Sequence, residues 1–168
     1  MPDAAAHLIF WPVAIIGLAA DLWTKWAVFN WLENRMPQNF SVIDGFFRFV
    51  LALNEGAAFG IAAGRTAQLT IVSVIALIAI FAIFFFSRIR QRFMILALGL
   101  FVAGICGNLY DRIFNQGCVR DFIDVYYRGS HWPAFNLADS MLCIAVALIL
   151  ISTIRSEIAS RKHVQQQK

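Results

Sequence analysis

The sequence predicts an all-α polytopic membrane protein with four transmembrane helices and a small β-sheet or amphipathic segment on the outer membrane face after the first helix. Two observations carry this prediction. Hydrophobic residues make up 60% of the chain and the mean hydropathy is +0.69, more apolar than a soluble domain of 168 residues needs. The few charged residues, 14% of the total, leave uncharged segments long enough to cross a hydrocarbon layer as helices of roughly 20 residues. We expect one membrane-embedded domain over residues 1–168.

The first predicted span covers residues 8–28. Trp23 and Trp26 suit the end of a helix at the membrane surface. A cleaved signal peptide is the alternative, but residues 1–7 lack the Lys or Arg with which a signal peptide begins. The sequence therefore favours a retained first helix.

A hairpin is predicted between the first two spans. Residues 40–53 contain two runs of β-favouring residues around Asp44-Gly45, which is a strong turn signal. We expect a small amphipathic sheet on the outer surface of the bilayer. A surface loop with apolar anchors is the alternative.

Three further spans follow, over residues 68–86, 93–110 and 133–154. The second is apolar on all sides, as a helix exposed to lipid should be. The fourth has Asn136 and Asp139 in its first two turns, and Pro133 suits a first helical position because its missing N–H costs nothing there.

Four spans place both termini on one side of the membrane. Short loops rich in Arg and Lys stay cytoplasmic, which predicts that the loop between spans two and three and the basic tail are cytoplasmic. The long first connection also carries Arg, but long loops cross membranes with less regard to charge. This rule accounts for the net charge of +4, so we expect no nucleic-acid partner. The basic residues concerned are Arg88, Arg90, Arg92, Arg155, Arg161, Lys162 and Lys168.

This topology gathers the polar residues at the outer membrane face. Spacings of three or four residues place those within one span on a shared helix face, and Gly104 and Gly107 would let a neighbouring helix approach span three closely. The residues predicted to meet are Asp21, Asn54, Asn108, Asp111, Arg112, Asp121, Asn136 and Asp139.

Carboxylates in a membrane protein indicate a functional site, because ionising them there is costly. Two aspartates that share a site would hold one proton between them, so one activates water while the other acts as an acid. That is aspartic-peptidase chemistry, which needs no metal or cofactor. The cysteines and histidines form no zinc ligand set, and Ser41, Ser73 and Ser87 have no Lys or His nearby in the sequence. Ser140 lies beside Asp139, but adjacent helical residues point apart. A proton or ion relay built from the same carboxylates remains an open alternative.

Structural explanations compete for individual residues. Asp111 and Arg112 suit an ion pair at a helix end, and Asp21 with Lys25 suits a charge pair at the membrane interface. Asp124 follows two apolar residues in a connection and is expected to be a solvated loop carboxylate.

Five ordered blocks over nearly the whole chain resemble the bacterial lipoprotein signal peptidase (signal peptidase II) family. One block alone would be weak evidence, whereas five in order are specific. The blocks are Asp21-Leu-Trp-Thr-Lys25, Asn54-Glu-Gly-Ala-Ala-Phe-Gly60, Gly104-Ile-Cys-Gly-Asn-Leu-Tyr-Asp-Arg112, Val119-Arg-Asp-Phe-Ile123 and Phe135-Asn-Leu-Ala-Asp139.

The resemblance implies an aspartic endopeptidase of the inner (cytoplasmic) membrane that removes the signal peptide of diacylglyceryl-modified prolipoproteins immediately before the lipidated cysteine. It implies that Asp121 and Asp139 are catalytic and that the other six residues gathered at the outer face support them. It also implies inhibition by globomycin-type cyclic peptides, and we expect a monomer. A proton-coupled transporter and a non-catalytic lipoprotein-binding scaffold are the alternatives, but no internal repeat supports a transporter.

Overall fold

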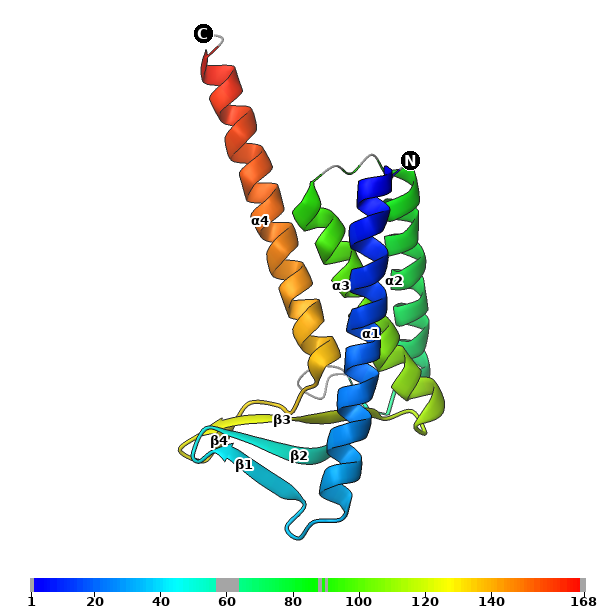
Figure 1. Ribbon diagram of the computed structural model, residues 1–168, viewed down its shortest axis with the longest axis vertical. Coiled ribbons are helices and arrows are strands. Elements are labelled where there is room, and N and C mark those ends of the chain that lie inside the picture. Colours follow the sequence, from blue (N-terminus) through cyan, green and yellow to red (C-terminus); the bar gives the residue numbers. More distant parts are fainter. Residues whose placement is uncertain (1, 57–63, 88, 90, 167–168) are drawn as a thin grey trace.

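The computed structural model describes residues 2–56, 64–87, 89 and 91–166, and over these residues the chain forms four helices and four strands. Both termini lie at one end of the helices and the sheet lies at the other (Figure 1). The predicted cationic residues Arg88, Arg90 and Lys168 fall outside the described residues. The elements are α1 (Ala4–Glu33), β1 (Asn39–Ile43), β2 (Phe47–Asn54), α2 (Thr66–Phe86), α3 (Arg92–Phe114), β3 (Val119–Tyr127), β4 (Ser130–His131) and α4 (Leu137–Gln166).

The four predicted spans are confirmed: each of these helices contains a segment long and apolar enough to cross a membrane. α1 begins where the Asp3 carboxylate accepts the N–H of Ala6 at 2.8 Å, and it continues to Glu33, beyond the predicted end at residue 28. The prediction that the fourth span starts at Pro133 is wrong, because α4 begins at Leu137. The segment before it runs along the sheet, where Phe135 bonds to Ile123 of β3.

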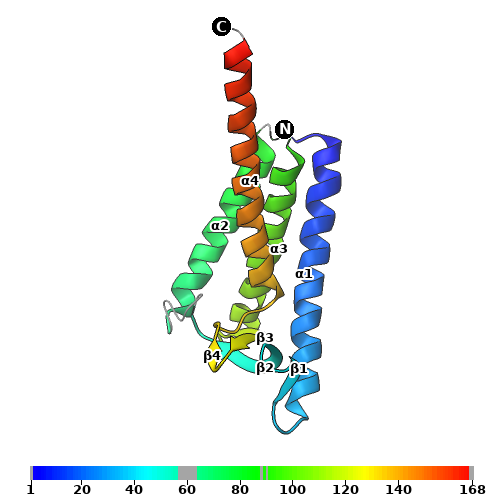
Figure 2. The ribbon, with the colours of Figure 1, turned by 90° about the vertical axis from the view of Figure 1, so that its left-hand side faces the viewer.

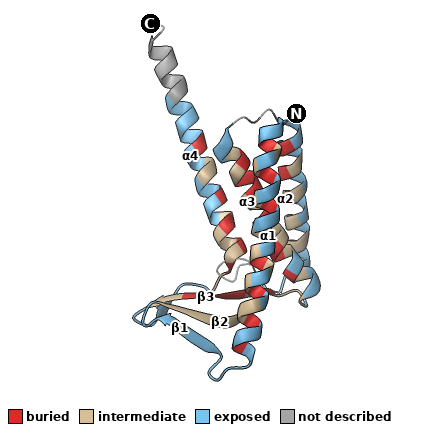
Figure 3. Cartoon of the chain, viewed as in Figure 1, coloured by how far each residue is buried: buried red, intermediate tan, exposed pale blue. Residues whose placement is uncertain are grey.

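α3 is the central helix and packs against α1, α2 and α4 (Figures 1 and 2). At the end away from the sheet the core is apolar, and the rings of Phe10 and Phe84 stack there with centroids 3.9 Å apart. Buried residues concentrate on α3 and on the helix faces turned toward it (Figure 3). Large apolar side chains such as Ile15, Ile75 and Leu150 are exposed on the outer faces of the bundle, as expected for helices surrounded by lipid.

The predicted hairpin is confirmed as β1 and β2, with Gly45 at a φ of 76° in the turn. A positive φ favours glycine, which has no Cβ to clash. The sheet is larger than predicted, because β3 and β4 add antiparallel strands in the order β1-β2-β3-β4. β3 pairs with β2 so that Asp121 lies opposite Ala52, which puts a carboxylate of the second connection at the centre of the sheet.

Small residues on α3 allow close helix contacts, as predicted. A Cβ added at Gly104 would lie 2.7 Å from the backbone oxygen of Ala138 on α4 and 2.8 Å from Cγ of Leu142. A Cβ added at Gly107 would overlap the carboxylate of Asp21 on α1. These two glycines set the separation of α3 from its neighbours at the level where the polar residues meet.

We therefore expect Gly104→Ala to lower the free energy of unfolding by about 1–3 kcal/mol, because the backbone of α4 must move away. Reversible unfolding in mixed micelles measures this change. The control is Ala79→Leu, which adds more volume on the exposed side of α2 and should have little effect. Equal losses in both variants would contradict the tight α3–α4 contact.

Candidate active site

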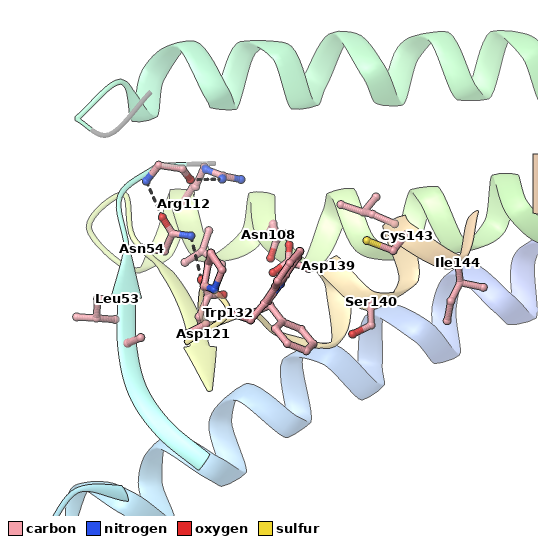
Figure 4. Close-up of a pocket in the computed structure, with 17 residues that line it drawn as sticks. Leu53, Asn54, Asn108, Arg112, Asp121, Trp132, Asp139, Ser140, Cys143 and Ile144 are labelled. Carbon is pink, nitrogen blue, oxygen red and sulfur yellow. Dashed lines mark hydrogen bonds between the residues drawn. The ribbon is translucent and has the colours of Figure 1, made fainter. Parts of the chain in front are cut away.

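All eight predicted site residues lie at the sheet end of the bundle, and five of them line one cavity of about 790 Å³ (Figure 4). The cavity lies where β2, β3 and the ends of α3 and α4 converge. The five are Asn54, Asn108, Arg112, Asp121 and Asp139. The remaining three, Asp21, Asp111 and Asn136, are fully buried beside it.

Two asparagines connect the two aspartates of the cavity. The side-chain amide of Asn136 donates to Asp121 Oδ1 at 2.7 Å and to Asn108 Oδ1 at 3.1 Å. Asn108 in turn donates through Nδ2 to Asp139 Oδ1 at 2.8 Å. Because the Asn108 oxygen is engaged as an acceptor, its NH₂ group is oriented toward Asp139. Both carboxylates are therefore held in fixed positions by amide donors.

Asp139 is also fixed by the first turn of its own helix. Asn136, just before α4, accepts the N–H of Asp139 at 3.0 Å, and Asp139 Oδ2 accepts the N–H of Asn136 at 3.2 Å. This reciprocal arrangement is a capping box, which satisfies N–H groups that a helix start leaves unpaired. It explains why α4 begins after Asn136 and not at Pro133.

Asp121 comes from β3 and has an elevated pKa. The pKa is raised to about 7, first by burial and then by the negative charge of Asp139, while hydrogen bonds from Asn54 and Asn136 partly oppose the rise. The Asn54 amide donates to Asp121 Oδ2 at 2.9 Å, and its own oxygen accepts the N–H of Gly56. The rest of the predicted Asn54 block, residues 57–60, lies outside the described residues.

A buried network of charged side chains contacts Asn108 and so supports the two asparagines. Lys25 Nζ lies 2.8 Å from Asp21 Oδ2 and 3.4 Å from Asp111 Oδ2, and it donates to Asn108 Oδ1 at 3.0 Å. Arg120 completes the network with a side-chain contact of 2.7 Å to Asp111. Two cations thus balance two carboxylates, which is the condition for keeping charges out of water.

The network corrects two sequence-based expectations. Asp21 and Lys25 do pair, but both are fully buried and belong to a larger network that includes Asp111. The expected ion pair of Asp111 with Arg112 does not form, because Asp111 binds Arg120 and Lys25. Arg112 instead donates to the backbone oxygen of Gly56 at 3.0 Å.

Lys25 and Arg120 were not among the predicted site residues. Both occur in the family blocks, and Lys25 is four residues from Asp21, which was the available signal. The partners that give Lys25 its importance, Asn108 and Asp111, are distant in sequence and become visible only in the fold.

Asp124 is not the solvated loop carboxylate that the sequence suggested. It lies on β3, is only 5% exposed, and contacts Arg48 at 2.6 Å and His131 at 3.0 Å. Burial alone would raise its pKa, but the hydrogen bonds from His131 and Arg48 outweigh that effect and lower it. Asp124 does not line the cavity and is a structural group of the sheet.

The cavity walls away from the carboxylates are mainly apolar. They come from the segment before α4 and from one face of α4, and include Trp132, Pro133, Phe135, Leu142, Cys143 and Ile144. Ile144 and Cys143 are exposed on the outer side of the bundle, so one wall continues into the surface that lipid would cover. The site can therefore accept an apolar molecule from the bilayer and bring it to two carboxylates.

A helical membrane protein with two aspartates in one cavity has the fold and site of a membrane-embedded aspartic hydrolase. Comparison with known proteins agrees. The family model described as signal peptidase (SPase) II matches residues 13–155. The chain belongs to the signal peptidase II family and is an aspartic-type endopeptidase.

Individual relatives match over nearly their whole length. The chain is 40% identical to a lipoprotein signal peptidase of Geobacter sulfurreducens over 90% of this chain and 94% of the relative. It is 38% identical to a lipoprotein signal peptidase of Syntrophus aciditrophicus over 89% of this chain and 94% of the relative. Among solved structures, a bacterial membrane enzyme determined by the in meso method at 2.3 Å is 33% identical with a TM-score of 0.78, covering 91% of this chain and 89% of that one.

The charge network yields a stability prediction. Lys25→Met should lower the free energy of unfolding by about 3–5 kcal/mol, because it leaves two buried carboxylates without their shared cation. Adding Asp21→Asn to that variant should recover part of the loss, since Asp111 keeps Arg120. Unfolding in mixed micelles compares the three proteins.

The matched control is Arg48→Met, which removes a partly exposed partner of Asp124. Because Arg48 reaches solvent and His131 still contacts Asp124, this variant should lose less than Lys25→Met, about 1–2 kcal/mol. A loss from Lys25→Met no larger than that from Arg48→Met would disprove the role assigned to the buried network.

Proposed function

We propose that the protein removes the signal peptide from diacylglyceryl-modified prolipoproteins, cutting immediately before the lipidated cysteine with water activated by Asp121 and Asp139. The observation that carries the proposal is that both carboxylates line one cavity and are linked through two asparagines that are hydrogen-bonded to each other, Asn136 to Asp121 and Asn108 to Asp139. The curated relatives, which are lipoprotein signal peptidases, support the substrate class.

The environment of Asp121 supports giving the two carboxylates different roles. With a pKa of about 7, Asp121 is mostly protonated below neutral pH and serves as the acid. Asp139 serves as the base. It takes a proton from water as the water oxygen attacks the scissile carbonyl carbon, and Asp121 gives its proton to the carbonyl oxygen.

The resulting tetrahedral intermediate carries two hydroxyl groups. Asp139 then protonates the amide nitrogen, the C–N bond breaks, and one hydroxyl returns its proton to Asp121. The products are the carboxyl end of the signal peptide and the free amino group of the lipidated cysteine. The dyad ends with one proton, as it began. Asn54 and Arg112, which border the same cavity, are proposed to hold the peptide and the dyad in place.

The apolar cavity walls suit such a substrate. The signal peptide would enter from the bilayer along the face of α4 while its acyl chains stay in lipid. Globomycin-type cyclic peptides would compete for the same cavity. We place both termini in the cytoplasm and the sheet end at the outer face of the inner membrane, because the described cations Arg92 and Arg155 lie in the end turns of two spans at the opposite end. We propose that one copy is sufficient, since this chain alone supplies all the residues of the dyad and its supports.

Removing either catalytic carboxylate should abolish cleavage. Asp121→Asn and Asp139→Asn should each reduce the rate by at least about 10³-fold, because each deletes one proton-transfer group. A gel-shift assay with a diacylglyceryl-modified prolipoprotein in detergent measures the rate. The control is Asp124→Asn, which removes a carboxylate from the same strand outside the cavity and should retain most activity. Full cleavage by either folded dyad variant would disprove the mechanism, and no cleavage by folded wild type on this lipidated substrate would disprove the function.

The elevated pKa of Asp121 predicts the pH dependence. The acid form is required, so the rate should fall as pH rises through about 7 and approach a tenfold drop per pH unit above it. Cleavage measured between pH 5.5 and 9 under saturating and limiting substrate tests this. Asp124→Asn should leave the fall at the same pH. A rate that stays constant from pH 6 to 9 would contradict the assignment of Asp121 as the acid.

A further inference from the structure

A second cavity, of about 360 Å³, lies at the end of the bundle away from the sheet. It is formed between the start of α3 and the last turns of the α4 span, and none of its lining residues belongs to the candidate active site. The lining residues are Gln91, Arg92, Phe93, Ser152, Arg155 and Ser156. These residues include two arginines, two serines and a glutamine, and most of the surface that they present to the cavity is apolar.

No carboxylate among the residues that line this cavity accompanies the two arginines. Neither Arg92 nor Arg155 forms an ion pair within the part of the chain that the structure describes, and no Asp or Glu lines the cavity. The guanidinium of Arg155 lies over the ring of Phe93, 5.3 Å from its centroid, which fixes the position of that cation. Two arginines therefore line one cavity that no described carboxylate lines.

The floor of the cavity is built from specific polar contacts. Ser152 is only 3% exposed, and its hydroxyl donates to the side-chain oxygen of Gln91. Because Gln91 is engaged there, its side chain does not cap α3, and the first turn of that helix has no side-chain cap. The partial positive charge of the helix start thus adds to that of the two arginines.

The cavity lies where two of the apolar spans end, α3 at its start and α4 at its last turn. Arg92 opens the apolar α3 span, and Arg155 lies three residues before Ile158, where the α4 span ends. Basic pockets between helices at a membrane surface bind anionic lipid head groups, and the planar fork of arginine matches phosphate oxygens. Arginines that only set the orientation of the helices in the membrane would need neither a shared cavity nor the buried hydroxyl of Ser152 beside it.

We propose that this cavity binds the phosphate of an anionic phospholipid in the leaflet opposite the sheet. Arg92 and Arg155 bind the phosphate oxygens, Ser156 borders the head group, and the acyl chains lie along the exposed apolar surface of the neighbouring helices. The site is separate from peptide cleavage and does not depend on the proposed function.

The test uses the full-length protein in neutral detergent and native mass spectrometry of retained lipid. Wild type is titrated with phosphatidylglycerol, with phosphatidylcholine of the same chains, and with inorganic phosphate as competitor. We expect about a tenfold preference for phosphatidylglycerol, which the double variant Arg92→Gln/Arg155→Gln reduces to twofold or less. Arg128→Gln, which removes an exposed cation from the opposite end of the molecule, is the matched control and should keep the full preference.

A second variant separates charge from geometry. Arg92→Lys/Arg155→Lys keeps both charges but loses the guanidinium forks, and we expect an intermediate preference. Unchanged thermal unfolding in phosphatidylcholine alone establishes that the variants are folded. An undiminished preference in the glutamine variant, or an equal loss in Arg128→Gln, would overturn the site. Displacement of the lipid by millimolar inorganic phosphate would show a soluble anion as the ligand and overturn the lipid assignment.

Discussion

The structure depends on keeping a charged lysine inside a membrane protein. Lys25 has no access to solvent, and it is tolerated only because Asp21, Asp111 and the oxygen of Asn108 surround it. In the low-dielectric interior, removing Lys25 leaves Asp21 without its cation, while Asp111 keeps only Arg120. The relative placement of α1, α3 and the strand that carries Arg120 is therefore fixed by electrostatics as well as by packing. The candidate active site adjoins this network, since Lys25 donates to Asn108 of the cavity.

The amide groups of Asn108 and Asn136, next to Lys25, give the two aspartates of the cavity different hydrogen-bonding environments. Asn108 accepts from Lys25 and so directs its NH₂ group toward Asp139, while Asn136 directs an amide toward Asp121 and caps the helix that carries Asp139. A single hydrogen-bonded chain thus runs from a buried cation to both carboxylates. Such chains orient each member through its neighbours, because an amide oxygen that accepts determines where its nitrogen must point.

Local patterns in the sequence predicted much of this architecture. Four apolar segments, the Asp44-Gly45 turn and the small residues of α3 each have a direct physical meaning, and the structure confirms them. The sequence also predicted that the polar residues meet at one end of the bundle. Successive spans run in opposite directions, which places the polar end of each span on the same side. Which of these residues carry out the chemistry stays a prediction.

The errors arose where partners are distant or compete. Asp111 lies beside Arg112 in sequence, but adjacent helical residues point apart, and the returning strand brings Arg120 to it instead. Asp124 was expected to be solvated, because the sequence does not show that β2 places Arg48 opposite it. β3 was missed although its β-branched and aromatic residues favour a strand, because its pairing partner lies about 70 residues earlier.

One contact has a consequence for how the protein is made. Asp21 on α1 accepts the backbone N–H of Ala138 at 2.8 Å, in the first turn of the last helix. During synthesis α1 enters the membrane long before α4 exists, so this carboxylate and the neighbouring ammonium must remain hydrated, or held by the insertion machinery, until the final span arrives. Proteolytic capacity would then appear only when the last segment is in place, and an incompletely inserted chain would be inactive in the membrane it occupies.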